Sequence, residues 1–226
     1  MFETPTATLY STVPTSIPPC PCVSTRCKPV GSDYNNRFNG PGLVLLSKQE
    51  ILSAKHQDFF PGKEQTIQRG FIEAEIKDLG TVVCSHFSSA FPYYFEYELS
   101  YDNYTQQQRE EMAVIQEKFS SRDHIVMADF NTGPRVEGPM DSQTSLAGEA
   151  PQNYQLWLQA GYNNTYMEAD GRCTFCTGNA IVDYPRVAID FVLFKGDYTA
   201  RQTQRTLDMS PPLSDHYGVR QTVCRN

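Results

Sequence analysis

The chain has 226 residues, of which 39% are hydrophobic and 20% are charged, and this composition is ordinary for one soluble globular domain. Its formal net charge of −7 argues against tight, passive wrapping of nucleic acid, but it does not exclude an enzyme that meets phosphate through a divalent cation. No apolar run of transmembrane length occurs, and no basic and apolar leader follows Met1, so we expect neither a transmembrane segment nor a signal peptide.

The N-terminal stretch differs in composition from the rest of the chain. Residues 1–41 are rich in proline, threonine, serine and cysteine, and the prolines interrupt any regular element. We therefore expect an irregular surface segment over 1–41. Short apolar runs take over from Gly42, so the folded domain is expected to span 42–226.

The apolar runs after Gly42 predict strands, interleaved with two amphipathic helices. Strands are expected at Leu43–Leu46, around Phe71, Ala74 and Ile76, from Thr81 to Cys84, over His124–Ala128, over Val187–Phe194 and over Tyr217–Cys224. A helix is expected over 105–120, with Thr105 as its cap and Met112, Ile115 and Phe119 facing inward, and another over 152–160, with Tyr154, Trp157 and Leu158 inward and Gly161 as its stop. Two sheets packed face to face with helices outside would accommodate these elements.

Seven cysteines are many for a cytosolic enzyme. Together with the N-x-[ST] sequons at Asn103 and Asn163, they favour a secreted or extracellular protein with disulfides. Sequons also arise by chance, and free cysteines also pack as small hydrophobes. A zinc site is disfavoured because the Cys173-x-x-Cys176 pair has no second pair of comparable spacing. The odd count leaves at least one thiol unpaired within the chain.

Polar side chains with catalytic potential lie where the expected strands end. They are His86, the pair Asp129 and Asn131, Asp190, and the pair Asp215 and His216. Each group has an alternative interpretation as a structural histidine, a turn or a cap. Asp190 is the most informative, because a carboxylate within so apolar a run needs a stabilising partner, and a histidine is a good candidate.

In chain order these groups resemble the endonuclease/exonuclease/phosphatase superfamily, which includes DNase I, abasic-site endonucleases, inositol phosphatases and neutral sphingomyelinases. The matching pieces run from residue 38 to residue 219. They are Phe38–Lys48, Arg69–Phe71, Val83–His86, Met127–Asn131, Ile189–Leu193 and Ser214–Val219. The resemblance implies an α+β fold, a four-layer α/β/β/α sandwich of two mostly antiparallel sheets.

The resemblance also implies hydrolysis of a phosphodiester by attack of water. His216, held by Asp190, would be the general base, since a carboxylate fixes the tautomer of an imidazole and raises its basicity. Asp129 and Asn131 would orient the water and contact the phosphate. His86 would hydrogen-bond a phosphate oxygen or assist the leaving group.

The expected cofactor is Mg²⁺, with Mn²⁺ or Ca²⁺ as alternatives, and Asp215 is the expected metal ligand. The family's Asn and its principal metal ligand, a Glu in a Gln-Glu motif, have no counterpart here. Glu3 is not assigned to that role, because no strand precedes it. We therefore expect a chain that begins just downstream of the missing Glu, with a sheet incomplete at its N-terminus, weakened metal binding and an exposed strand edge.

The substrate implied by the resemblance is a phospholipid headgroup or nucleic acid. The stretch Phe38–Lys48 and the Phe71 strand look closest to the sphingomyelinase-like branch. The aromatic run Phe91–Tyr97 is expected either to make peripheral contact with a lipid headgroup layer or to pack in the core. A DNase I-like endonuclease and a catalytically impaired binding protein on the same scaffold are the alternatives.

Overall fold

The computed structural model describes residues 43–62, 69–89, 104–139, 142–183 and 185–226. The expected irregular segment 1–41 and the aromatic run at 91–97 therefore lie outside the described residues. The described strands are β1 (Ile51–Asp58), β2 (Gly70–Ile76), β3 (Gly80–His86), β4 (His124–Asp129), β5 (Asp190–Lys195), β6 (Tyr198–Thr206) and β7 (Gly218–Arg225). The described helices are α1 (Tyr104–Lys118), α2 (Pro151–Gln159) and α3 (Thr165–Ala169). Among these helices none is long and apolar enough to span a membrane.

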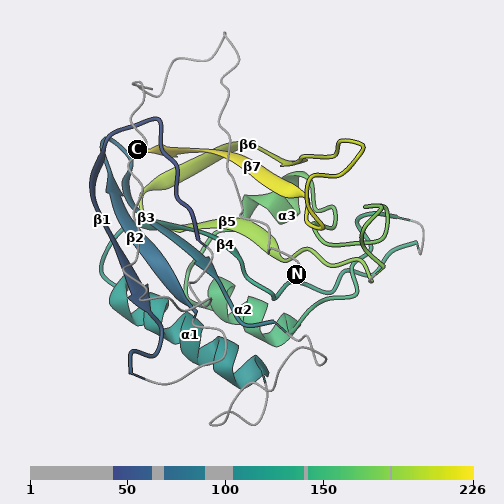
Figure 1. Ribbon diagram of the computed structural model, residues 1–226, viewed down its shortest axis with the longest axis horizontal. Coiled ribbons are helices and arrows are strands. Elements are labelled where there is room, and N and C mark those ends of the chain that lie inside the picture. The colour runs from purple at the N-terminus through teal and green to yellow at the C-terminus, as the bar shows by residue number, and fades with distance from the viewer. Residues whose placement is uncertain (1–42, 63–68, 90–103, 140–141, 184) are drawn as a thin grey trace, which may run out of the picture.

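The strands form two sheets. A five-stranded sheet has the order β1-β2-β3-β4-β5, and β6 pairs with β7 in a second sheet. The β3–β4 pair is parallel, while the other pairs are antiparallel. Figure 1 shows β6 and β7 lying over one face of the five-stranded sheet and α1 and α2 over the other, and α3 contacts β6 and β5. The expected α+β fold, with two mostly antiparallel sheets and helices outside, is confirmed.

The core lies on both faces of the five-stranded sheet. Val83 on β3, Val126 on β4 and Leu193 on β5 are fully buried. Strands covered on both faces read as continuous apolar runs rather than alternating ones. For this reason the runs that predict β3 and β4 are recognisable in the sequence, and β2 is recognisable by its partly alternating apolar residues. Strand β7 is also confirmed, and β5 begins at Asp190 rather than at Val187.

Helix α1 buries a polar face as well as an apolar one. Met112, Ile115 and Phe119 are buried as expected, but so are the helix residues Gln107, Gln108 and Glu111. The Glu111 carboxylate accepts hydrogen bonds from the backbone N–H of Ser88 at 2.8 Å, the Ser88 hydroxyl at 2.6 Å and the Gln107 amide at 3.1 Å. Gln108 Nε2 donates to the carbonyls of Ser88, Phe130 and Asn131 at 2.8, 3.2 and 2.9 Å. Helix α1 is thereby tied to the turns that follow β3 and β4.

Several local expectations were wrong. Leu43–Leu46 is not a strand; Leu45 is buried in the core while Val44 and Leu46 are exposed, because an apolar run can be buried without strand pairing. Thr105 lies inside α1, which begins at Tyr104, so Thr105 is not its cap. The stop at Gly161 is confirmed, since this residue has a φ of +87° that favours glycine.

Strands β1 and β6 were missed by the sequence analysis because both are largely polar. Their sequences are ILSAKHQD and YTARQTQRT. Neither is covered on both faces, and their burial is accordingly partial. Such strands are recognised by the neighbour with which they pair rather than by their own periodicity.

Replacing Glu111 by leucine should destabilise the fold by about 2–4 kcal/mol, because it leaves the buried Ser88 donors without their acceptor. The measurement is the free energy of unfolding in urea. The control is Glu117→Leu on the exposed face of the same helix, which should change stability by less than about 0.5 kcal/mol. Equal effects of the two substitutions would contradict the structural importance of the buried carboxylate.

Candidate active site

Strand register brings three of the predicted site residues into one row. His86 ends β3, Asp129 ends β4 and Asp190 begins β5. His86 pairs with Asp129 across the parallel ladder, and Asp129 pairs with Asp190 across the antiparallel one. Because neighbouring strands lie about 4.8 Å apart, the three side chains meet at one end of the sheet.

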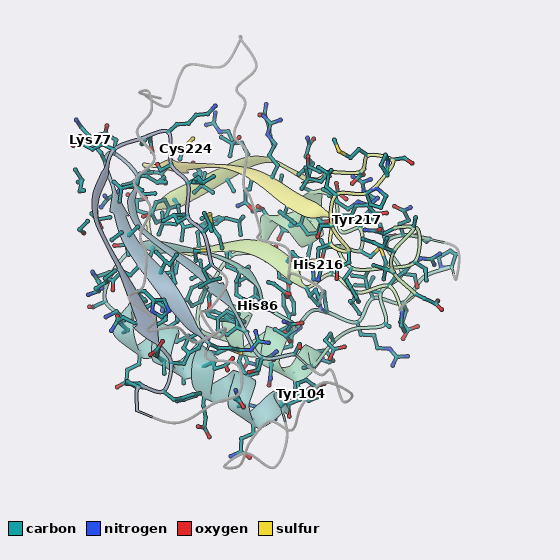
Figure 2. The ribbon with its side chains drawn as sticks, in the orientation of Figure 1. Lys77, His86, Tyr104, His216, Tyr217 and Cys224 are labelled. Atoms are coloured by element: carbon teal, nitrogen blue, oxygen red, sulfur yellow. A yellow bond between two sulfur atoms is a disulfide. The ribbon has the colours of Figure 1, made fainter. Side chains whose placement is uncertain are left out.

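His216 reaches this row from the segment that leads into β7. Its backbone N–H donates to Ser214 Oγ at 3.0 Å, and its imidazole Nδ1 lies 2.9 Å from Asp190 Oδ2. The buried carboxylate and the histidine that the sequence singled out as partners are therefore in hydrogen-bonding contact. Figure 2 shows His86 and His216 on neighbouring parts of the molecule.

The two imidazoles face the same carboxylate. Asp129 Oδ2 lies 3.4 Å from His86 Nε2 and 4.0 Å from His216 Nε2. The His86 and His216 side chains are 33% and 22% exposed, whereas those of Asp129 and Asp190 are 15% and 14% exposed. The two imidazoles are thus partly open to solvent, while the Asp129 and Asp190 carboxylates are largely shielded from water.

Asn131 is held next to Asp129 by the turn after β4. Its backbone N–H donates to Asp129 Oδ1 at 2.8 Å, and its Nδ2 donates to the Phe87 carbonyl at 2.9 Å. Its φ of +47° lies in the left-handed region, which asparagine tolerates better than most residues. Asn131 therefore links the ends of β3 and β4 and orients the Asp129 carboxylate. Its contact with a phosphate or with water stays a prediction.

Arg69 is a site residue to which the sequence analysis gave no role. Its side chain is buried, and Nη1 donates to the carbonyls of His86 and Phe87 at 3.1 and 2.8 Å. A buried guanidinium in this place brings positive charge to a site rich in carboxylates. The available signal was an arginine directly before the buried strand β2, in the piece Arg69–Phe71 that carries the resemblance.

The electrostatics of the site follow from burial and the two carboxylates. Burial disfavours the charged form of His216, but the charge and hydrogen bond of Asp190 outweigh it and raise the His216 pKa to about 10. Burial, together with the nearby charge of Asp190, raises the pKa of Asp129 to about 7. Burial and the charges of Arg69 and His216 hold the pKa of His86 well below its usual value. His86 is therefore a neutral imidazole at neutral pH.

The chemistry of the donor atoms fits a divalent cation. Ligand atoms of Asp129, Asp190 and His216 all lie within 4.8 Å of one another. After burial, repulsion by Asp190 contributes to the raised pKa of Asp129, and a cation relieves such repulsion. Since Asp190 already accepts from His216, Asp129 is the better candidate ligand of the pair.

Asp215, the predicted metal ligand, does not belong to that three-residue group. Its carboxylate accepts a hydrogen bond from Ser214 Oγ at 3.2 Å, and its charge acts on His216. Asp215 thus lies near enough for its charge to act on the His216 imidazole, and its contact with a metal stays a prediction.

The fold that carries this site is similar to those of several solved structures. No family model and no curated protein matches the sequence. Similar solved structures include an endonuclease/exonuclease/phosphatase from Beutenbergia cavernae, with 15% identity over 80% of this chain and 46% of that one, and a TM-score of 0.53. A family protein from Leptotrichia buccalis shares 13% identity over 79% and 63% of the two chains, with a TM-score of 0.51. An endonuclease/exonuclease/phosphatase from Bacteroides vulgatus shares 15% identity over 78% and 66%, also with a TM-score of 0.51.

These likenesses concern the fold, because the identities are low. The chain spans between 46% and 66% of the length of the three proteins. All three are named as endonuclease/exonuclease/phosphatase proteins, and none of them is named as a sphingomyelinase. The chain therefore has the endonuclease/exonuclease/phosphatase fold that its motifs predict.

Proposed function

We propose that the chain is a divalent-metal-dependent phosphoesterase that hydrolyses a phosphodiester by attack of water. The observation that carries this proposal is the Asp190–His216 pair, with 2.9 Å between Oδ2 and Nδ1, placed beside Asp129 and His86. An imidazole held by a carboxylate next to further phosphate-facing groups is the arrangement that general-base hydrolysis requires.

His216 would be the general base. Asp190 holds its Nδ1, so Nε2 is the nitrogen that faces the attacking water. The two carboxylates alone keep His216 protonated at neutral pH, whereas a divalent cation next to Asp129 would lower its pKa, because like charges disfavour the imidazolium, and would leave Nε2 free to take the proton. The carboxylate also stabilises the imidazolium that forms, which makes the proton transfer easier. Asp129, 4.0 Å from that Nε2, would help to orient the water, together with Asn131.

His86 and the proposed metal ligands would act on the phosphate. As a neutral imidazole, His86 can donate a hydrogen bond to a phosphate oxygen or to the leaving group. Asp129 and Asp215 would hold a divalent cation, Mg²⁺ by preference with Mn²⁺ or Ca²⁺ as alternatives, which supplies positive charge at the phosphate.

A sphingomyelinase-like phosphodiesterase is the favoured branch, on the resemblance of Phe38–Lys48 and on one surface feature. Ile181 and Leu213 are 61% and 70% exposed. Their segments are joined by the bond from Asn179 Nδ2 to the Ser214 carbonyl at 2.7 Å, and Ser214 in turn holds His216. Exposed apolar side chains on segments that are joined to His216 in this way suit a phospholipid headgroup presented at a membrane surface. A DNase I-like endonuclease is the alternative.

We also propose an oxidising location outside the cytosol. Cys173 and Cys176 form a disulfide, Cys224 is also disulfide-bonded, and among the described cysteines the buried Cys84 is free. Asn163, the acceptor of one sequon, is exposed. Disulfides persist chiefly in oxidising compartments, where an exposed sequon can also be glycosylated.

His216→Ala should lower the Mg²⁺-dependent hydrolysis of bis(p-nitrophenyl) phosphate by about 10²–10⁴-fold, because the general base is lost. Asp190→Asn should lower it as well, whereas Asp183→Asn, an exposed aspartate outside the site, should not. Unchanged activity of the His216 variant would sink the assignment. A wild-type protein that hydrolyses nothing with Mg²⁺, Mn²⁺ or Ca²⁺, and shows no heat of metal binding in calorimetry, would support the alternative of a catalytically impaired binding protein.

Ile181→Ser combined with Leu213→Ser should reduce hydrolysis of sphingomyelin in vesicles about tenfold or more, since each exposed apolar side chain contributes to membrane contact. Hydrolysis of soluble bis(p-nitrophenyl) phosphate should be unaffected. Leu156→Ser, an exposed leucine on α2, is the matched control. Cleavage of plasmid DNA with no turnover of sphingomyelin would favour the endonuclease alternative instead.

Asn163→Gln should remove one step of N-glycosidase-sensitive mobility on a gel when the chain is secreted from a eukaryotic cell. Asn226→Gln, which changes an exposed asparagine outside any sequon, should leave the mobility pattern as it was. A wild-type protein without any glycosidase-sensitive shift would contradict glycosylation at Asn163.

A further inference from the structure

The segment Cys173–Cys176 contacts the backbone next to both members of the proposed catalytic pair, Asp190 and His216. Thr174 Oγ1 accepts hydrogen bonds from the backbone N–H groups of Ile189 at 3.0 Å and Asp190 at 3.1 Å. The Thr174 carbonyl accepts from the backbone N–H of Tyr217, the residue after His216, at 2.7 Å. One residue therefore holds the backbone on both sides of the Asp190–His216 hydrogen bond.

Phe175 supports the imidazole itself. Its backbone exchanges two hydrogen bonds with Val187, both of 3.0 Å, three residues before Asp190. The centroids of the Phe175 and His216 rings lie 4.8 Å apart, and the angle between the ring planes is 40°. Rotation of His216 away from Asp190 is thereby restricted on the face that Phe175 covers.

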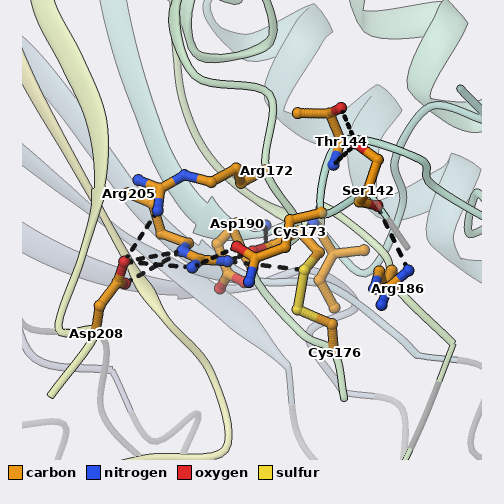
Figure 3. The surroundings of a disulfide bond; sticks show 12 residues. Ser142, Thr144, Arg172, Cys173, Cys176, Arg186, Asp190, Arg205 and Asp208 are labelled. Carbon is orange, nitrogen blue, oxygen red and sulfur yellow. Dashed lines mark hydrogen bonds and ion pairs between the residues drawn. A yellow bond between two sulfur atoms is a disulfide. The ribbon is translucent and has the colours of Figure 1, made fainter. Parts of the chain in front are cut away.

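The disulfide between Cys173 and Cys176 closes a ring around these two supporting residues. Both cysteines are buried. Arg205 Nη1 donates to the Cys173 carbonyl at 2.9 Å, and the Arg205 guanidinium also lies 4.1 Å from the centre of the Tyr217 ring. Figure 3 shows the disulfide with Arg205 extended between Cys173 and Asp208. The ring and the residue after His216 thus share one buried anchor.

The small size of the ring indicates what the disulfide does. The two cysteines are separated by three positions in the sequence. A cross-link over so short a loop excludes few unfolded conformations, so its entropic effect on global stability is small compared with that of a long loop. Its main physical effect is to fix the backbone of Thr174 and Phe175.

We propose that the Cys173–Cys176 disulfide is a positioning element for the Asp190–His216 pair, acting through Thr174 and Phe175. The catalytic part of this inference rests on the proposed function, while the geometric part does not. Reduction by a dithiol breaks the Sγ–Sγ bond and places one proton on each sulfur. The dithiol supplies the two electrons and two protons and closes into its own cyclic disulfide. The reduced loop then holds the pair less firmly.

The kinetic test removes the Cys173–Cys176 disulfide and the Thr174 hydroxyl in separate variants. Cys173→Ala combined with Cys176→Ala should lower kcat for bis(p-nitrophenyl) phosphate about 10–100-fold with KM unchanged, as expected for groups that orient a catalytic residue. Thr174→Val should do the same, and Thr174→Ser, which keeps the hydroxyl, should recover most of the loss. Dithiothreitol should slow hydrolysis by the wild type but not by the double cysteine variant. The Cys224→Ala variant, which lacks another disulfide, should still be slowed by dithiothreitol.

A second measurement does not depend on turnover. The His216 Nδ1 proton shared with Asp190 should give a strongly downfield proton NMR signal in the metal-free protein, assigned by its absence in His216→Ala. The signal should weaken or move in Thr174→Val and in the double cysteine variant, but not in Cys224→Ala. An inactive wild type would count against the proposed function and leave this measurement intact. An unchanged signal in Thr174→Val would overturn the positioning role, even if the double cysteine variant fails to fold.

Discussion

The hydrogen bond between Asp190 and His216 is the interaction on which the site depends. It joins the first residue of β5, in the five-stranded sheet, to the segment that enters β7, in the other sheet. A carboxylate so shielded from water is stable only when a partner compensates its lost hydration. The contact that satisfies Asp190 therefore ties the two sheets together and sets the position of the His216 imidazole.

The sequence predicted the parts of the fold in which burial leaves a local pattern. The apolar runs of β3 and β4 are continuous because helices cover one face of the sheet and β6–β7 covers the other, while β2 keeps a partly alternating pattern. Strands β1 and β6 are polar and are defined by their pairing partners, so periodicity did not reveal them. Leu43–Leu46 shows the opposite failure, since an apolar run was taken for a strand that the chain does not form.

In the candidate site, too, the sequence revealed only the residues that leave a local pattern. Asp190 stood out because its neighbours in sequence are apolar, and its need for a partner pointed to a histidine. The supports of the site left no such signal. Arg69, Gln108 and Thr174 act through carbonyls and N–H groups 15 or more positions away in the sequence, and only the folded chain brings those groups together. The sequence likewise did not establish the disulfide between Cys173 and Cys176, because free cysteines remained an alternative interpretation of the C-x-x-C motif.

Strand register has a consequence for how this site can vary. Successive side chains on a strand point to opposite faces, so a slip of one residue in β4 would turn Asp129 away from His86 and Asp190. The positions of His86, Asp129 and Asp190 are thus set by the pairing of β3, β4 and β5. Insertions between β4 and β5 that avoid the turn at Asn131 and the segment Cys173–Cys176 would leave these three residues in place. A single insertion inside β3, β4 or β5 would dismantle this arrangement.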